Sequence, residues 1–400
     1  MSAETLDRPK IKSLESYDMS ADRGFLCRHD AGAVTLAGDW ADAGRVALML
    51  PHILPSGRVR DYLETHLPHH DLVATLDLLS DAEARMAMVH YSFMVQSYVW
   101  GEPIPPHTLP AKLAVPMVAL ADRLEQQPLL PYSAYVLDNW ALLDSDRPLD
   151  LDNIYMIQNF LGGQDEAWFV LIHVAIEACA GQALAEMEPI VKAVTQDDAS
   201  DVRNRLEKMA VVWASINGIF DRMVDRCDPY IYFERVRPYI HGWKDNPALP
   251  NGIIYEGVER YGTAGQAFRG QTGSQSSIVP SMDALMGIGH AADPLKAYLD
   301  QLHIYRPPGH RHFMEDVRAA SELRPFVERA QSKGLADAYN AIVQAVSDFR
   351  SRHLAYAASY INKQGKRSEG NHTDVGTGGT PFMRYLKKHR DETAANLIRA

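Results

Sequence analysis

Four long segments of this chain carry apolar residues at intervals of three and four, the spacing that places them on one face of an α-helix. These segments are residues 166–194, 199–226, 282–302 and 334–362. Nowhere does the chain sustain the apolar–polar alternation of a half-buried strand, and it has no fixed-period repeat. We therefore predict an all-α protein.

The chain of 400 residues is longer than one hydrophobic core usually serves, so we expect two domains. Segment 145–153 is polar and interrupted by proline, and it marks the expected boundary. Residues 1–150 would form a small helical domain with a polar arm, and residues 151–400 a large helical domain. In the small domain, Ser80 and Glu83 have the spacing of a capping box, which predicts a long helix that ends before Gly101.

The amino-acid composition limits the kinds of binding partner and the cellular compartment that we expect for this protein. The 51 acidic residues exceed the 40 basic ones, which disfavours the phosphate neutralisation that nucleic-acid binding requires. The three cysteines are widely separated, so we expect neither a disulfide framework nor a zinc site. Residues 1–28 lack an apolar leader, and we find no run of about 18 apolar residues. These features predict a cytoplasmic protein without a nucleic-acid or membrane partner.

His353 lies on the apolar stripe of the last long segment, together with Ile342, Val346, Phe349 and Tyr360. A histidine in this position can be an ordinary core residue, because burying a neutral imidazole that has one hydrogen bond costs little. A neutral imidazole on a rigid helix is also the usual proximal ligand of a haem iron that must bind oxygen. Periodicity alone leaves both interpretations open.

A second histidine, His173, shares an apolar helix face with Phe169, Ile172 and Ile176. It too can be a plain core residue. If this helix faced the His353 helix across a pocket, His173 would stand on the far side of the iron. It could then hydrogen-bond dioxygen or a substrate N–H.

Aromatic and basic residues gather just after Pro229, among them Tyr232, Phe233 and Arg237. The rings could stack on a planar substrate, and the guanidinium could hold its carboxylate through two hydrogen bonds. The alternative is a partly buried aromatic helix whose arginines reach water. Segment 364–380 is polar and ends in a Gly-Thr-Gly-Gly-Thr run, which we interpret as a loop that gates a site, with Thr377 as a donor.

Several motifs in order along the chain resemble the indoleamine 2,3-dioxygenase family. The match extends from about residue 48 to the C-terminus, which is more specific than any single motif. The motifs are YVW at 98–100, LAVP at 113–116, YSAYVLDNW at 132–140, GWKDNP at 242–247, YEG at 255–257, QSS at 275–277, PPGHR at 307–311, RSRHL at 350–354 and GTGGT at 376–380.

The resemblance implies a small helical domain capping a large helical domain that carries haem b. It implies that His353 is the proximal iron ligand, supported by Asp283 and Arg350. Arg237 would bind the substrate carboxylate. The remaining residues that the resemblance and the helix pattern place around the substrate are Tyr132, Phe169, Tyr232, Phe233 and Thr377.

Two positions depart from the animal members of the family. His173 replaces a distal serine, and Tyr232 replaces one of two pocket phenylalanines. A distal histidine also occurs in the related tryptophan 2,3-dioxygenases, where it positions the indole N–H. The leading hypothesis is therefore cleavage of the indole C2–C3 bond of L-tryptophan or a related indole by dioxygen, giving an N-formylkynurenine-type product.

Two alternatives stay open at this point. The first is a haem enzyme that oxidises or rearranges a modified, for example halogenated, tryptophan in secondary metabolism. The second is an oxygen-binding or haem-binding protein without turnover, for which the same iron site would suffice. Arg237 and Thr377 argue against the second alternative, because oxygen storage has no need of a carboxylate-binding group.

Overall fold

The computed structural model describes residues 10–364, 377 and 382–399 and is mainly helical. Within those residues, strands are confined to four short pieces. One pair, β1 with β4, is parallel, and the other, β2 with β3, is antiparallel. The strands are β1 (Thr108–Leu109), β2 (Trp140–Leu142), β3 (Ile154–Met156) and β4 (Ile254–Tyr255). The predicted all-α class is confirmed.

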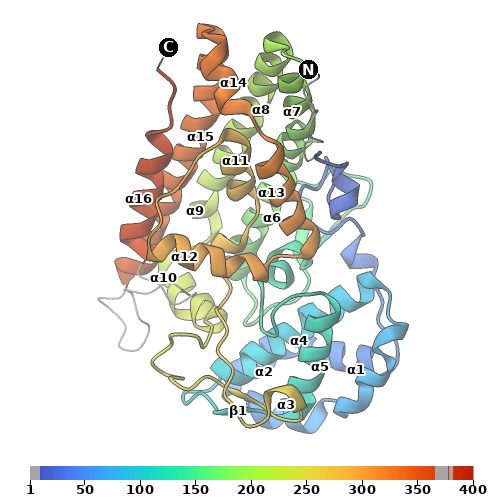
Figure 1. Ribbon diagram of the computed structural model, residues 1–400. Coiled ribbons are helices and arrows are strands. Elements are labelled where there is room, and N and C mark those ends of the chain that lie inside the picture. The colour runs from blue at the N-terminus through green and yellow to red at the C-terminus, as the bar shows by residue number, and fades with distance from the viewer. Residues whose placement is uncertain (1–9, 365–376, 378–381, 400) are drawn as a thin grey trace.

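Three long helices form the centre of the upper body in Figure 1, where α8 packs against both α6 and α15. Two of them begin at side-chain caps that satisfy free backbone N–H groups: Asp198 accepts from the start of α8, and Ser332 accepts from Leu335 of α15. The helices of this body are α6 (Gln164–Ala185), α7 (Met187–Thr195), α8 (Ala199–Asp221), α9 (Met223–Arg226), α10 (Pro229–Ile231), α11 (Ile278–Met286), α12 (Pro294–Gln301), α13 (Pro308–Ala320), α14 (Leu323–Ala330), α15 (Lys333–Ala357) and α16 (Phe382–Ala394).

The lower body in Figure 1 is built around α4, which is buried along most of its length. The predicted capping box is confirmed: the Ser80 hydroxyl accepts from the backbone N–H of Glu83, and the Glu83 carboxylate accepts from the N–H of Ser80. The helices of this body are α1 (Gly38–Leu48), α2 (Leu50–Ile53), α3 (Val59–His66), α4 (Asp81–Trp100) and α5 (Ala111–Arg123).

One predicted helix is wrong. Segment 282–302 does not form a continuous helix, because α11 ends at Met286 and α12 starts only at Pro294. Gly287 ends α11 in the left-handed conformation (φ +66°), which residues with a side chain rarely adopt. The Asp293 side chain then caps the new helix at Lys296.

The expected domain boundary, segment 145–153, lies in the loop of the β2–β3 hairpin. The Asn153 side chain closes this loop by donating to the carbonyls of Asp144, Arg147 and Pro148. One cluster of buried apolar residues runs from Ile11 to Tyr360 without a break. The division into two domains at this hairpin stays a prediction.

The described part of the N-terminal arm is packed into the protein. Tyr17 donates a hydrogen bond to Asp316 of α13 (2.6 Å), and the Phe25 ring lies 4.7 Å from the ring of His310. Gly24, at φ +58°, approaches α6 so closely that a Cβ atom there would lie 2.0 Å from the carbonyl oxygen of Glu177. The arm was predicted to be polar, but its apolar side chains help to cover α6 and α13.

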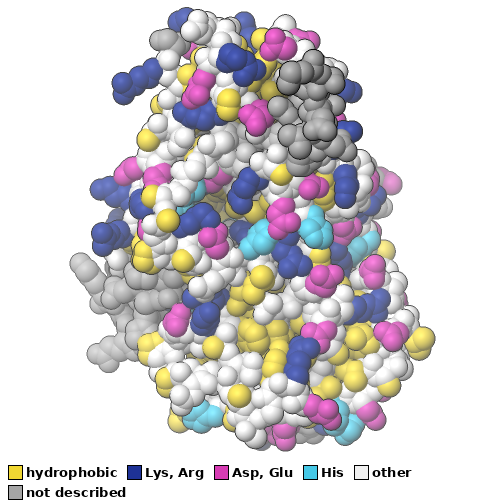
Figure 2. All heavy atoms as spheres, viewed as in Figure 1, with side chains coloured by type: hydrophobic (Ala, Val, Ile, Leu, Met, Phe, Trp, Pro, Cys, Tyr) yellow, Lys and Arg dark blue, Asp and Glu magenta, His cyan; other side chains and the backbone are white. Residues whose placement is uncertain are grey.

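Residues 164–195, which form α6 and α7, are long and apolar enough to cross a membrane by length and composition alone. The sequence analysis found no such stretch. In the folded chain, 72% of the most apolar window is buried inside the protein, as in the core helix of a folded domain. On the face shown in Figure 2, acidic and basic side chains are interspersed, so this face carries no basic track of the kind that follows a phosphate backbone.

We predict opposite effects of alanine at two helical glycines. A Cβ atom at Gly181 of α6 would lie 2.5 Å from the carbonyl oxygen of Ala21 and 2.7 Å from the nitrogen of Gly24. Because both are backbone atoms, Gly181→Ala should lower the free energy of unfolding by about 1–3 kcal/mol. A Cβ atom at Gly218 of α8 would have no atom within 4 Å. Because alanine favours the helix over glycine, Gly218→Ala should raise the free energy of unfolding by roughly 0.5–1 kcal/mol.

Guanidinium unfolding of the two variants measures this difference. Equal stabilities would contradict the close packing of the N-terminal arm on α6.

Candidate functional site

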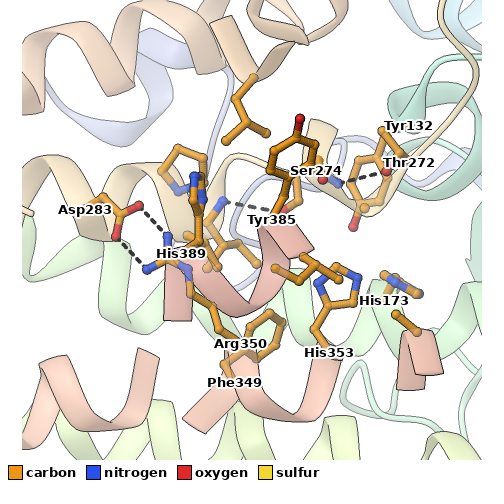
Figure 3. A pocket seen from close by; sticks show the side chains of 18 of the residues that line it. Tyr132, His173, Thr272, Ser274, Asp283, Phe349, Arg350, His353, Tyr385 and His389 are labelled. Carbon is orange, nitrogen blue, oxygen red and sulfur yellow. Dashed lines mark hydrogen bonds and ion pairs between the residues drawn. The ribbon is translucent and has the colours of Figure 1, made fainter. Parts of the chain in front are cut away.

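A cavity of about 850 Å³ opens between α6, α11, α13 and α15, and it brings together most of the predicted site residues. Figure 3 shows that side chains from several of these elements converge on it. Eight of the ten residues that we singled out from the sequence line it. They are Tyr132, Phe169, His173, Tyr232, Asp283, Arg350, His353 and Thr377.

The two predicted histidines lie close together in this cavity, His173 from α6 and His353 from α15 (Figure 3). His353 makes no hydrogen bond within the described part of the chain. Burial, and then the nearby His173 and Arg350, lower its pKa to about 4. Burial also lowers the pKa of His173, against the opposing effect of its hydrogen bond to Phe169. Both imidazoles are therefore neutral at pH 7, the form that can bind a metal or accept a hydrogen bond.

The tautomer of His173 follows from one hydrogen bond. Its Nδ1 lies 2.7 Å from the carbonyl oxygen of Phe169, one helical turn earlier. Because a carbonyl oxygen only accepts, Nδ1 must carry the proton. Nε2 of a neutral His173 is therefore a pure acceptor.

Aromatic rings form the wall beside His173. The ring of Phe169 lies 4.8 Å from the ring of His173 and 4.6 Å from that of Tyr232, and Tyr132 meets His173 edge-on at 6.3 Å. Phe169, His173 and Glu177 are four residues apart on α6, so they occupy one face of that helix. The wall offers flat apolar surface for a planar group.

A charged network lies at another part of the cavity, beside α16 (Figure 3). Arg350 binds Asp283 through two hydrogen bonds of 2.6 and 3.2 Å, and His290 bridges Asp283 and Glu392. Burial acts to raise the pKa of Asp283, but Arg350 and His290 outweigh it and lower that pKa. Asp283 and Arg350, the two residues predicted to support His353, form an ion pair with each other, and this pair ties α11 to α15.

Thr377 lines the cavity and is held from two sides. Its hydroxyl donates to the carbonyl of Gln271 (2.6 Å), and its own carbonyl accepts from the N–H of Gly242 (3.3 Å). The other residues of the predicted gating loop, 365–376 and 378–380, lie outside the described residues.

Arg237 and Phe233 are buried but do not line the cavity as the structure describes it. The Arg237 guanidinium lies 5.5 Å from the centre of the Phe233 ring. Burial lowers the pKa of Arg237 to about 10, partly offset by Tyr232. Tyr232, which precedes Phe233, does line the cavity and lies close enough to Arg237 to act on its pKa.

The residues present fit a haem group. Haem is a flat, mainly apolar molecule with an iron at its centre and acidic groups on one edge. The cavity offers an apolar aromatic wall, a neutral imidazole on His353 that makes no hydrogen bond with a described residue, and arginines along its lining.

Known proteins resemble this chain over nearly its whole length. A family model described as indoleamine 2,3-dioxygenase matches residues 13–396. The chain is 30% identical to human indoleamine 2,3-dioxygenase 2 over 98% of both chains, and 32% identical to rat indoleamine 2,3-dioxygenase 1 over 96% of both. It is 29% identical to the indoleamine 2,3-dioxygenase of Saccharomyces cerevisiae, over 98% of this chain and 96% of that one. The chain belongs to the indoleamine 2,3-dioxygenase family.

The resemblance inferred from the motifs is thereby confirmed, as is the enzyme class that it implies. Members of the indoleamine 2,3-dioxygenase family are haem-dependent dioxygenases, which are oxidoreductases that act on indoles such as tryptophan. These comparisons do not test the roles predicted for individual residues, which stay predictions.

Glu177 is a cavity residue that the sequence analysis missed. Its Oε1 accepts hydrogen bonds from the hydroxyls of Tyr132 and Ser276, each at 2.8 Å, while its Oε2 is buried without a partner among the described residues. Burial raises the pKa of Glu177 to about 7, although both hydrogen bonds act to lower it. The signal was present, because a lone acid interrupts the long apolar helix α6 four residues after His173.

We predict that Glu177 makes stability depend on pH. Its folded pKa lies above its unfolded value of about 4.5, so its contribution is full below pH 4.5 and is lost as pH rises through 7. Between pH 4.5 and 8 the free energy of unfolding of the wild type should fall by about 3 kcal/mol more than that of Glu177→Gln, because each pKa unit corresponds to 1.36 kcal/mol.

Urea unfolding of both haem-free proteins across this range tests the prediction. Subtracting the two curves removes the titration of the buried histidines, whose lowered pKa values act in the opposite direction. A difference that does not change with pH would show that Glu177 titrates as in the unfolded chain.

Proposed function

We propose that this protein uses haem b and dioxygen to cleave the indole C2–C3 bond of L-tryptophan or a related indole, giving an N-formylkynurenine-type product. The observation that carries the proposal is the pair of neutral histidines, His173 and His353, in one aromatic-walled cavity. When bound, haem supplies the activation of oxygen, and the protein supplies binding, orientation and exclusion of water.

His353 would hold the iron. Its helix, α15, is packed against both α8 and α16, so the imidazole is carried by a helix that is held on two sides. Asp283 and Arg350 would support this side of the cavity through their ion pair. The burial that keeps His353 neutral also favours its binding to a metal over its binding to a proton.

His173 would orient the indole. Because its Nε2 is a pure acceptor, this atom suits the N–H of an indole and could not donate a hydrogen bond to oxygen. Phe169, Tyr132 and Tyr232 would enclose the ring. The hydrogen bond to Phe169 thus favours one of the two roles that the sequence analysis left open.

Arg237 would take the substrate carboxylate, with Phe233 beneath it and Thr377 closing over the amino acid. Arg237 is buried and does not line the cavity as the structure describes it, so this role requires neighbouring side chains to move when substrate enters. The buried position keeps the guanidinium away from water, which strengthens a charge-assisted hydrogen bond.

A modified indole is the second candidate substrate class, and the hydroxyl of Tyr232 in the aromatic wall favours it. Such a relative would oxidise or rearrange a substituted tryptophan. Difference spectra with halogenated and side-chain-altered indoles separate the two, because a specialised enzyme should bind one of them more tightly than L-tryptophan.

We also propose a cytoplasmic location. Cys27, Cys179 and Cys227 are all unpaired thiols, as is usual in a reducing compartment.

We predict that His353→Ala abolishes or shifts the Soret band of the haem-loaded protein and removes N-formylkynurenine formation from L-tryptophan. His303→Ala is the matched control, because His303 also lines the cavity but is half-exposed and pairs with Glu315. It should keep both the spectrum and the activity. A fully haem-loaded, reduced wild type that turns over no L-tryptophan would exclude that substrate, and a folded protein that stays colourless with excess haem would exclude the whole assignment.

We predict that His173→Ala weakens binding of L-tryptophan about 10-fold but leaves binding of 1-methyl-L-tryptophan unchanged, because only the former has an indole N–H to donate. Spectral titration of the haem-loaded protein gives both dissociation constants. Equal losses for the two ligands would point to a packing role for His173.

A further inference from the structure

Arg306 is a buried cation that lines the cavity and has no role in the proposed reaction. It lies between the short helix Leu302–Tyr305 and α13, and only 3% of it is exposed. Pro307 follows it and holds its backbone extended (φ −86°, ψ 150°). Its side chain is thus anchored at a stiff position and lines the cavity.

Among the described residues, the hydrogen bonds of Arg306 leave its charge without a counter-ion. Nη2 donates to the carbonyl of Ser274 (2.8 Å) and, at 3.4 Å, to that of Ser276. Nε is buried without a partner among the described residues. Within the same residues no Asp or Glu forms an ion pair with it, and the charge that bears on it most is a second cation, Arg318.

Other arginines with little exposed surface have the acidic partner that Arg306 lacks among the described residues. Arg350 is bound twice by Asp283, and Arg85 is paired with both Asp18 and Asp138. Burial, followed by Arg318, lowers the pKa of Arg306 to about 10, so it remains charged at pH 7. An unpaired charge in such a place is costly unless something neutralises it.

We propose that Arg306 binds a carboxylate of the molecule that occupies the cavity. The inference rests on the proposed function, which puts two carriers of carboxylates there: haem b, through its propionates, and the amino acid. Arg350 is already committed to Asp283, whereas the guanidinium of Arg306 has a free Nε and a fixed orientation set by the two serine carbonyls. A planar guanidinium suits a carboxylate because it can donate two parallel hydrogen bonds.

The first arm of the test titrates haem-free protein with haem b and with its dimethyl ester, which has the same ring but no carboxylates. Wild type, Arg306→Gln, Arg306→Lys and Arg318→Gln are compared by Soret absorbance. Arg318→Gln removes the same charge from an exposed side chain that lines the same cavity. If Arg306 binds a propionate, Arg306→Gln weakens the binding of haem b about 10-fold and leaves the binding of the ester unchanged. Arg306→Lys and Arg318→Gln should then lose less affinity for haem b.

The second arm uses the haem-loaded ferric proteins and follows the spectral shift with L-tryptophan and with tryptamine, which lacks the carboxylate. If Arg306 binds the carboxylate of the amino acid, Arg306→Gln weakens the binding of L-tryptophan about 10-fold and leaves the binding of tryptamine unchanged. Thermal melting of every variant identifies any that fails to fold, and Arg306→Lys then provides the comparison with a cation retained.

A selective loss in the first arm assigns Arg306 to haem, and a selective loss in the second assigns it to the substrate. Equal effects on both members of each pair, or no effect at all, would overturn the inference. Failure of the proposed function looks different, because the wild type would then bind neither haem b nor its ester.

Discussion

Burial of the groups that line the cavity between α6 and α15 is the constraint from which the chemistry of this site follows. It lowers the pKa values of His173 and His353, so that both stay neutral at pH 7, raises the pKa of Glu177 to about 7, and lowers the pKa of Arg306 to about 10. In water each of these groups would titrate near its ordinary value. The cavity is therefore an electrostatic environment made by helix packing as much as a space of the right size.

The geometry of α6 places several of these groups side by side at the cavity. Phe169, His173 and Glu177 follow one another at intervals of four on α6, so the aromatic wall, the acceptor nitrogen and the carboxylate lie in one column. The N-terminal arm packs on the same helix one turn further along, where Gly24 closely approaches Glu177 and Gly181.

Much of the fold and part of the site could be predicted from the sequence. The stripe that includes His353 and the capping box at Ser80 are local patterns, and both are present as predicted. The break in segment 282–302 was missed because hydrophobic spacing continues across Gly287, where the backbone turns. Local patterns report which face of a helix is apolar, but they do not report where a backbone reverses.

Glu177 and Arg306 were missed for a different reason. Each is an ordinary charged residue in its local sequence, and its significance depends on which distant groups surround it in the fold. The hydroxyls that meet Glu177 come from Tyr132 and Ser276, 45 and 99 residues away. What matters at Arg306 is the absence of a carboxylate nearby in the described residues, and no sequence pattern encodes that.

Buried charges in this protein thus fall into two groups. Pairs such as Arg350 with Asp283 and Arg85 with Asp138 are complete within the chain and join its helices. Glu177 and Arg306 are incomplete, and both line the cavity. A ligand that completes them would remove part of the cost of their burial, and because it binds only the folded chain it would stabilise the fold by mass action. In this protein, occupation of the cavity and stability of the helices around it are therefore expected to be coupled.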